Sequence, residues 1–159
     1  MEEQNRKRIR LENFNYASAG AYFITVCTKD RSTILWENVG ADIIRPENVP
    51  LSAIGKIADR AIRQIPVHYE NISVDKYCIM PDHIHLILSI HSGDSGRMIS
   101  APTVSTVVGS MKRWVSKQAG RPIWQRSFYD HGIRNQRDYD EIWEYIENNP
   151  LKYALNRTP

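Results

Sequence analysis

The feature that most constrains the fold is a stretch in the middle of the chain where two apolar runs are separated by a short break. Residues 74–80 are mostly β-branched or apolar, Pro81 and Asp82 interrupt the run, and residues 83–90 resume it. Short apolar runs bounded by turn-forming residues are typical of β-strands. We therefore predict two neighbouring strands with a break at Pro81 and Asp82.

The second of these strands carries two histidines, His83 and His85, which are separated by one residue. Side chains two apart on a strand point to the same face, so both imidazoles should face one way while Ile84 and Leu86 face the core. Two imidazoles among aliphatic residues cost free energy unless they bind something, and imidazole is the commonest protein ligand of metal ions. The pair alone leaves a metal site and a structural role equally open.

Periodicity predicts the remaining elements. The predicted strands are residues 21–28 and 124–133, with a turn at 29–32, a short strand or strand extension at 34–36, and loops at 40–50 and 91–103. The predicted helices run from the cap Ser52 to a stop at Pro66, from Val104 to near Gly120, and from the cap Asp138 to about Asn148, where Asn149 and Pro150 should end the helix. The order β, α, β, β, α, β, α predicts an α+β fold, a ferredoxin-like antiparallel sheet with helices packed mainly on one face.

Composition favours a single domain spanning residues 1–159, because 42% apolar and 25% charged residues in a chain of 159 are ordinary for a globular protein. No apolar run approaches the roughly 18 residues of a membrane span, and no apolar segment of a secretory signal follows the N-terminus. Cys27 and Cys78 lie in strand-like runs, which favours two buried, reduced thiols. We expect a cytoplasmic protein without membrane contact, with residues 1–13 as a flexible basic arm.

Charge is unevenly distributed along the chain. The net charge is +3, basic residues cluster within 6–10, 112–121 and 126–137, and acidic residues concentrate within 138–147. A charge cluster is usually a solvated face. A polyanionic partner such as nucleic acid is therefore permitted by the charge, but it needs support from the chemistry of a site.

Near the end of the chain, Tyr145 and Asn149 are four residues apart, which places them on one face of the predicted third helix. Asn149 offers an amide oxygen, and two imidazoles, one amide oxygen and water suit Mg²⁺ or Mn²⁺. Taken singly, Tyr145 could pack its ring on the sheet and Asn149 could cap the helix. The combination with His83 and His85 favours a joint site.

Four segments occur together in the order found in a known family. They are GAYFITVCT at 20–28, MPDHIH at 80–85, WQRSFYDH at 124–131 followed by IRN at 133–135, and YIENNPLK at 145–152. As a set they resemble the HUH single-tyrosine transposases, in the branch of REP-associated tyrosine transposases, from about Arg8 to Leu155. Asp82 departs from the asparagine common before the first histidine, which adds negative charge but removes no ligand.

The resemblance implies an enzyme that cleaves and rejoins single-stranded DNA near hairpins through a 5′-phosphotyrosine intermediate. In this scheme His83, His85 and Asn149 hold Mg²⁺ or Mn²⁺, and Tyr145 is the nucleophile. A base for the tyrosine is not identified. His131 is a candidate, although a structural or DNA-contacting role is the simpler interpretation.

The implied partner is hairpin-containing single-stranded DNA, bound through basic side chains. The candidate residues are Arg8, Arg10, Lys112, Arg113, Lys117, Arg126 and Arg134. Two other functions are considered: a non-catalytic, domesticated DNA-binding protein, and another HUH endonuclease of the replication-initiator or relaxase type. The intact candidate site argues against the first and the short chain against the second. Relatives occur as monomers and as dimers, and a homodimer is the assembly that we slightly favour.

Overall fold

The computed structural model describes residues 20–37, 49–91 and 103–157. Its elements are β1 (Gly20–Cys27), the short 3₁₀ helix η1 (Lys29–Arg31), α2 (Ala53–His68), β2 (Ile72–Ile79), β3 (His83–Ile90), α3 (Val104–Ala119), β4 (Tyr129–Gly132) and α4 (Gln136–Arg157). This order of strands and longer helices is the predicted one. The predicted arm at 1–13, and most of the predicted loops at 40–50 and 91–103, lie outside the described residues.

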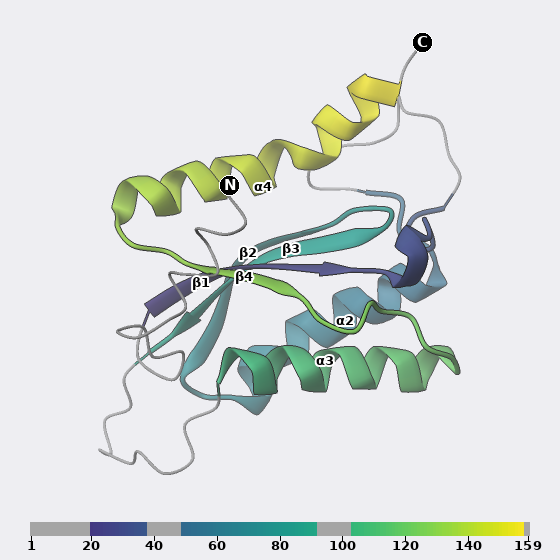
Figure 1. Cartoon of the computed structure of the whole chain (residues 1–159), viewed down its shortest axis with the longest axis horizontal. Coiled ribbons are helices and arrows are strands. Elements are labelled where there is room, and N and C mark those ends of the chain that lie inside the picture. The colour runs from purple at the N-terminus through teal and green to yellow at the C-terminus, as the bar shows by residue number, and fades with distance from the viewer. Residues whose placement is uncertain (1–19, 38–48, 92–102, 158–159) are drawn as a thin grey trace.

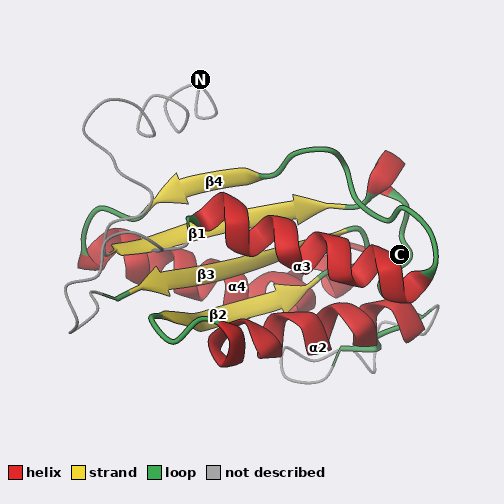
Figure 2. Cartoon of the chain, turned by 90° about the horizontal axis from the view of Figure 1, so that it is seen from below, coloured by secondary structure: helices red, strands yellow, loops and turns green. Residues whose placement is uncertain are grey.

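The four strands form one sheet in the order β2-β3-β1-β4, and every neighbouring pair is antiparallel. Strand β3 therefore lies between β1 and β2, while β4 and β2 are the two edges (Figure 2). This strand order, with α2 between β1 and β2 and α3 between β3 and β4, is that of a ferredoxin-like sheet. The predicted α+β class is confirmed.

Side chains alternate along the strands, so the sheet has a core face and an opposite face. We call the opposite face the site face, and Phe23, Thr25, His83 and His85 belong to it. Tyr22, Ile24, Ile84 and Leu86 are fully buried on the core face, as the two-residue period of a strand requires. Helices α2 and α3 cover this face, and α4 crosses the opposite face (Figure 1). The predicted one-sided layout thus describes α2 and α3, and α4 is the exception to it.

Capping residues fix the ends of α2 and α3. The Ser52 hydroxyl accepts a hydrogen bond from the Gly55 amide at 3.0 Å, and the Thr103 hydroxyl accepts one from the Thr106 amide at 3.1 Å. Gly120 ends α3 with φ 78°, a left-handed conformation that glycine adopts without strain. The predictions at Ser52 and Gly120 are confirmed.

The two predicted proline stops are wrong. Helix α2 continues past Pro66 to His68, and α4 continues past Pro150 to Arg157. An internal proline removes its own amide hydrogen bond, but packing can hold the flanking turns in place. After Pro66 the backbone resumes hydrogen bonding, since the Tyr69 amide donates to the Ile65 carbonyl at 3.0 Å.

The start of α4 and the last strand also differ from prediction. The Asn135 side chain accepts a hydrogen bond from the Asp138 amide at 2.8 Å, so Asn135 caps the helix instead of Asp138. Strand β4 covers four residues instead of 124–133, because the carbonyls of residues 125–127 accept hydrogen bonds from the Lys112 ammonium group. The predicted strand at 34–36 is a single bridge between Trp36 and Leu51.

The two cysteines are free and buried, as predicted, and burial raises the pKa of the Cys78 thiol to about 12. Within the part of the chain that the structure describes, none of the helices has the length and apolar character needed to cross a bilayer. The cytoplasmic location stays a prediction.

A close backbone contact at Gly55 gives a test of the fold. A Cβ atom at this position would lie 2.1 Å from the Leu35 carbonyl oxygen, so Gly55→Ala should lower the free energy of unfolding by roughly 1–3 kcal/mol. Gly109→Ala is the matched control, because there the nearest atom is the mobile end of Arg113 at 3.3 Å. That variant should gain up to about 1 kcal/mol from helix propensity. Urea unfolding would measure both, and equal effects would contradict this packing.

Candidate active site

The two histidines begin the central strand and point to the site face. The ring centroids of His83 and His85 are 4.6 Å apart, with an angle of 70° between the planes. Ile84 and Leu86, which alternate with them, are fully buried on the core face. The predicted separation of imidazoles and core residues is therefore confirmed.

Each imidazole uses its Nδ1 atom for a hydrogen bond. His83 Nδ1 lies 2.7 Å from an Asp82 carboxylate oxygen, and His85 Nδ1 lies 2.9 Å from the Thr25 hydroxyl. Asp82 also pairs with Arg31 at 3.1 Å. The Nε2 atom of His85 is buried and has no hydrogen-bond partner within the described ranges. A buried nitrogen without a partner needs an explanation, and a bound metal ion is one that suits an imidazole.

Burial keeps both imidazoles neutral. It lowers the pKa of His85 to about 3, with further lowering by the neighbouring His83 and by Arg31. Burial also lowers the pKa of His83, against the opposing effect of the Asp82 carboxylate. Because the Asp82 carboxylate can only accept, the proton of neutral His83 lies on Nδ1, and its Nε2 keeps a free lone pair. Neutral rings with a lone pair on Nε2 are the form that binds metal ions.

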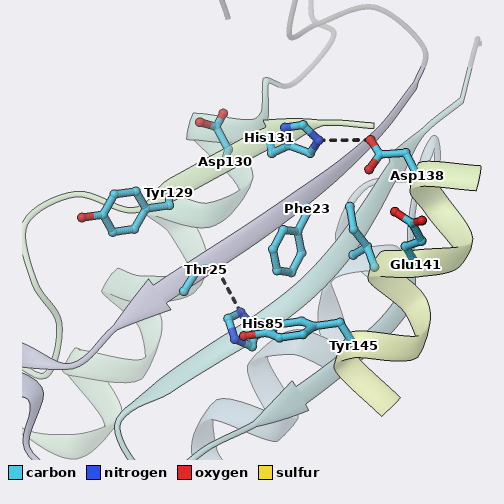
Figure 3. Close-up of a pocket in the computed structure, with 10 residues that line it drawn as sticks. Phe23, Thr25, His85, Tyr129, Asp130, His131, Asp138, Glu141 and Tyr145 are labelled. Carbon is cyan, nitrogen blue, oxygen red and sulfur yellow. Dashed lines mark hydrogen bonds and ion pairs between the residues drawn. The ribbon is translucent and has the colours of Figure 1, made fainter. Parts of the chain in front are cut away.

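Tyr145 extends from α4 and lies next to His85 over the site face of the sheet. Its ring centroid lies 5.3 Å from that of His85 and 6.2 Å from that of Phe23, which extends from β1 (Figure 3). About half of the Tyr145 side chain is exposed. Residues 60 positions apart in the sequence thus form one aromatic cluster at the surface, where a large substrate can reach the phenol.

Asn149 lies one helical turn after Tyr145 and is partly buried. The alternative that Asn149 caps the helix is wrong, because α4 continues to Arg157. Asn149 and His83 are not among the residues that line the pocket at Tyr145. The role of Asn149 as a metal ligand stays a prediction.

Polar contacts hold α4 on the sheet, and they are difficult to predict from the sequence. Strand β2 has an irregular register between Val74 and Lys76, and Asp75 lies at that irregularity. The Asp75 carboxylate accepts hydrogen bonds from Ser73, Ser89 and Tyr139, at 2.6–2.7 Å. The Tyr139 bond fixes the first half of α4. The available signal was the carboxylate of Asp75 within a strand-like run.

A second anchor lies beyond Tyr145 on the same helix. Lys76 forms an ion pair with Glu147, and its ammonium group lies 5.0 Å from the centroid of the Trp143 ring. Ile146 between them is buried. The two anchors therefore flank Tyr145 and set its position over His85.

His131, the candidate base, pairs with Asp138 and not with Tyr145. Its Nε2 atom lies 3.1 Å from the Asp138 carboxylate, which also accepts the Arg134 amide hydrogen bond at 3.3 Å. This pair joins β4 to the start of α4. The arrangement favours the structural interpretation of His131.

The predicted DNA-binding residues lie mainly away from Tyr145. Lys112 is partly buried against the carbonyls before β4, and burial lowers its pKa, so it acts as a structural lysine. Arg113 and Lys117 are exposed on α3, on the face opposite α4, and Arg126 and Arg134 are exposed on either side of β4. Arg8 and Arg10 lie outside the described residues.

Comparisons with known proteins agree with this fold. The solved structure of a REP-associated tyrosine transposase bound to a REP hairpin superposes with a TM-score of 0.65 at 23% identity, over 90% of this chain and 73% of that chain, which shows the same fold. A Haemophilus influenzae relative, named as an uncharacterized protein, is 28% identical over 172 residues, 96% of this chain and 92% of the relative. The REP-associated tyrosine transposase of Escherichia coli is 30% identical over 82 residues, 51% of this chain and 46% of that protein.

The family assignment rests on a longer match. Residues 17–149 match the model of the family described as "Transposase IS200 like". This range contains the histidine pair on β3, Tyr145 and Asn149. The predicted resemblance is confirmed, and the chain belongs to the IS200-like transposase family.

Proposed function

We propose that this chain is a metal-dependent transposase that cuts and rejoins single-stranded DNA near hairpins, with Tyr145 as its nucleophile. The observation that carries the proposal is the contact between the Tyr145 and His85 rings, beside a buried His85 Nε2 with no hydrogen-bond partner in the described part of the chain. Family membership supports the reaction class, and the structural relative bound to a REP hairpin supports DNA as the partner. The homodimer stays a prediction.

The histidine pair fits a divalent cation such as Mg²⁺ or Mn²⁺. Both Nδ1 atoms are engaged, by Asp82 and Thr25, which orients the Nε2 atoms as ligands. The described residues contain no group of three His, Cys, Asp or Glu side chains that could hold a metal ion. We assign the third protein ligand to the Asn149 amide oxygen, with water completing the shell. The bound ion would polarise the scissile phosphate and offset its growing negative charge.

In the reaction, the Tyr145 phenol loses its proton and its oxygen attacks phosphorus. The bond between phosphorus and the 3′ oxygen breaks, and that oxygen takes up a proton to become a free 3′-OH. The other fragment stays linked to Tyr145 through its 5′ phosphate, which preserves the energy of the phosphodiester bond. A 3′-OH can then attack the phosphotyrosine and release Tyr145. The half-exposed position of the ring lets a strand approach and leave.

Binding of the hairpin is assigned to the exposed basic residues. Helix α3 contains no acidic residue, and Arg113 and Lys117 are exposed on it, whereas the exposed side of α4 carries Asp140, Glu141 and Glu144. A polyanion is attracted to the first surface and repelled by the second. Arg126 and Arg134 are exposed on either side of the edge strand β4 and add to the basic residues available to the DNA.

The metal assignment predicts the effect of removing each imidazole. His83→Ala and His85→Ala should each abolish cleavage of a hairpin-bearing strand in Mn²⁺. Thr25→Val, which removes the hydroxyl at His85, should weaken Mn²⁺ binding about 10–100-fold by calorimetry. His91→Ala is the control, because it removes an exposed imidazole after the end of β3. Cleavage at the wild-type rate by either alanine variant of the pair would disprove the metal site.

The nucleophile assignment predicts where the DNA becomes attached. Tyr145→Phe keeps the ring contacts with His85 and Phe23, so folding, Mn²⁺ binding and DNA binding should persist while the covalent adduct disappears. Mass spectrometry of the wild-type adduct should find the nucleotide on the peptide containing Tyr145. Tyr69→Phe is the control and should still form the adduct, because the Tyr69 hydroxyl lies against Ser110 of α3, at 3.4 Å, and takes no part in holding α4. An adduct on any other tyrosine would overturn the mechanism.

The basic surface predicts a change in the salt dependence of DNA binding. Arg113→Glu and Lys117→Glu should each weaken binding and reduce the slope of log K against log salt by about 1, because each phosphate contact releases counterions. Lys112→Met is the contrasting variant. It should lower the free energy of unfolding, since it removes the bonds to three carbonyls, and leave the slope unchanged. An unchanged slope in both glutamate variants would place the DNA on another surface.

A further inference from the structure

Helix α4 leaves part of the site face uncovered. It packs over β2 and β3, and the side chains of β1 and β4 on the same face form the floor of a pocket of about 430 Å³. The floor consists of Phe23, Thr25, Tyr129 and His131 (Figure 3). Their strand register explains this layout, because Thr25 is opposite Tyr129 and Phe23 is opposite His131. The pocket is therefore built from paired strands and a helix.

The two ends of this pocket differ in chemistry. At one end lie Tyr145 and His85, which is 6% exposed and has a buried, unpartnered Nε2 atom among the described residues. At the other end lie the carboxylates of Asp138 and Glu141, from the first turns of α4 (Figure 3). The histidine end suits a phosphate with its cation, and the acidic end repels a second phosphate.

The acidic end suits a group that donates hydrogen bonds. One Asp138 oxygen is already used by His131 and the Arg134 amide. Among the described residues, one Glu141 oxygen forms an exposed ion pair with Arg137 at 3.4 Å. Ionised carboxylates can only accept hydrogen bonds. The aromatic floor offers ring surfaces on which a planar group can stack. A flat group with an amino edge, next to a phosphate, describes a nucleobase.

We propose that this pocket holds one unstacked nucleobase next to the scissile phosphate, and that Glu141 selects bases with an exocyclic amino group, such as cytosine and adenine, over thymine. The inference rests on the proposed function for DNA as the ligand and adds a specificity residue to it. Carboxylates recognise the N4 amino group of cytosine in this way, whereas thymine presents a carbonyl oxygen that a carboxylate repels. Enzymes that handle unstacked bases commonly combine aromatic stacking with such edge contacts.

The test measures binding of labelled hexanucleotides of dC, dA or dT by fluorescence anisotropy, with the Tyr145→Phe chain in Mn²⁺ so that no strand is cut. The dC and dA strands should bind about tenfold more tightly than the dT strand. Glu141→Gln, added to this chain, should reduce the ratio to within about twofold, because an amide can donate to thymine as well as accept from cytosine. The readout is the ratio of the affinity for the dC or dA strand to that for the dT strand. Affinity alone is not suitable, because removing a negative charge strengthens binding of every strand.

Glu144→Gln is the matched control, with the same change of charge at an exposed position of α4 that does not line the pocket. It should leave the ratio at about tenfold. A strand of 2-pyrimidinone, the cytosine ring without its amino group, should bind like dT to the unaltered Glu141 chain, whatever the stability of the variants. The absence of a preference, or a ratio that Glu141→Gln leaves unchanged, would overturn the proposal.

The binding ratio tests the base pocket, and the covalent adduct tests the proposed function, so the two can fail separately. A preserved ratio without any covalent adduct on the wild-type chain would reject the nucleolytic mechanism and keep the base pocket. Adducts that form equally well whichever base flanks the cleaved phosphate would keep the mechanism and reject the pocket.

Discussion

The candidate site depends on the pairing of β3 between two other strands. Because β3 is central, a slip of one residue would turn Ile84 and Leu86 out of the core and bury His83 and His85 beneath α2 and α3. The free energy of burying aliphatic side chains therefore also holds both imidazoles on the site face. The register with β1 then places Thr25 opposite His85, where its hydroxyl bonds the ring. The register of β3 therefore determines both the packing of the core and the orientation of the two imidazoles.

Helix α4 depends on a different kind of interaction. Among its described side chains, those of Ile146 and Pro150 are buried, and Tyr139, Ile142 and Tyr153 are partly buried against the core. The bonds from Tyr139 to Asp75 and from Glu147 to Lys76 supply specific positions on either side of Tyr145. A narrow buried stripe leaves the tyrosine ring half exposed, and polar anchors still fix where the ring lies. Accessibility and precise placement of Tyr145 are thus compatible.

The sequence predicts the features that depend on local periodicity and misses those that depend on distant partners. The orientation of His83 and His85 follows from the two-residue period of a strand. The position of α4 on the opposite face, the anchor at Asp75 and the inward direction of Lys112 each depend on residues at least 13 positions away. The rule that proline ends a helix failed at Pro66 and Pro150 because it is local, whereas flanking turns are also held by tertiary packing. The family could be predicted because the four motifs, taken together, resemble one known family.

Charge separates the two faces of the molecule in a way that the mechanism needs. The exposed side chains of α3 include Arg113 and Lys117, whereas those of α4 include Asp140 and Glu144. On the proposed function, a strand that contacts both α3 and Tyr145 passes around the β4 edge, where Arg126 is exposed, because the acidic surface of α4 repels phosphates. On the same proposal, the phosphate next to Tyr145 lies at the histidine end of the pocket, away from Asp138 and Glu141. Repulsion by Asp138 and Glu141, at the acidic end of the pocket, would therefore help to select which phosphate of the strand reaches Tyr145.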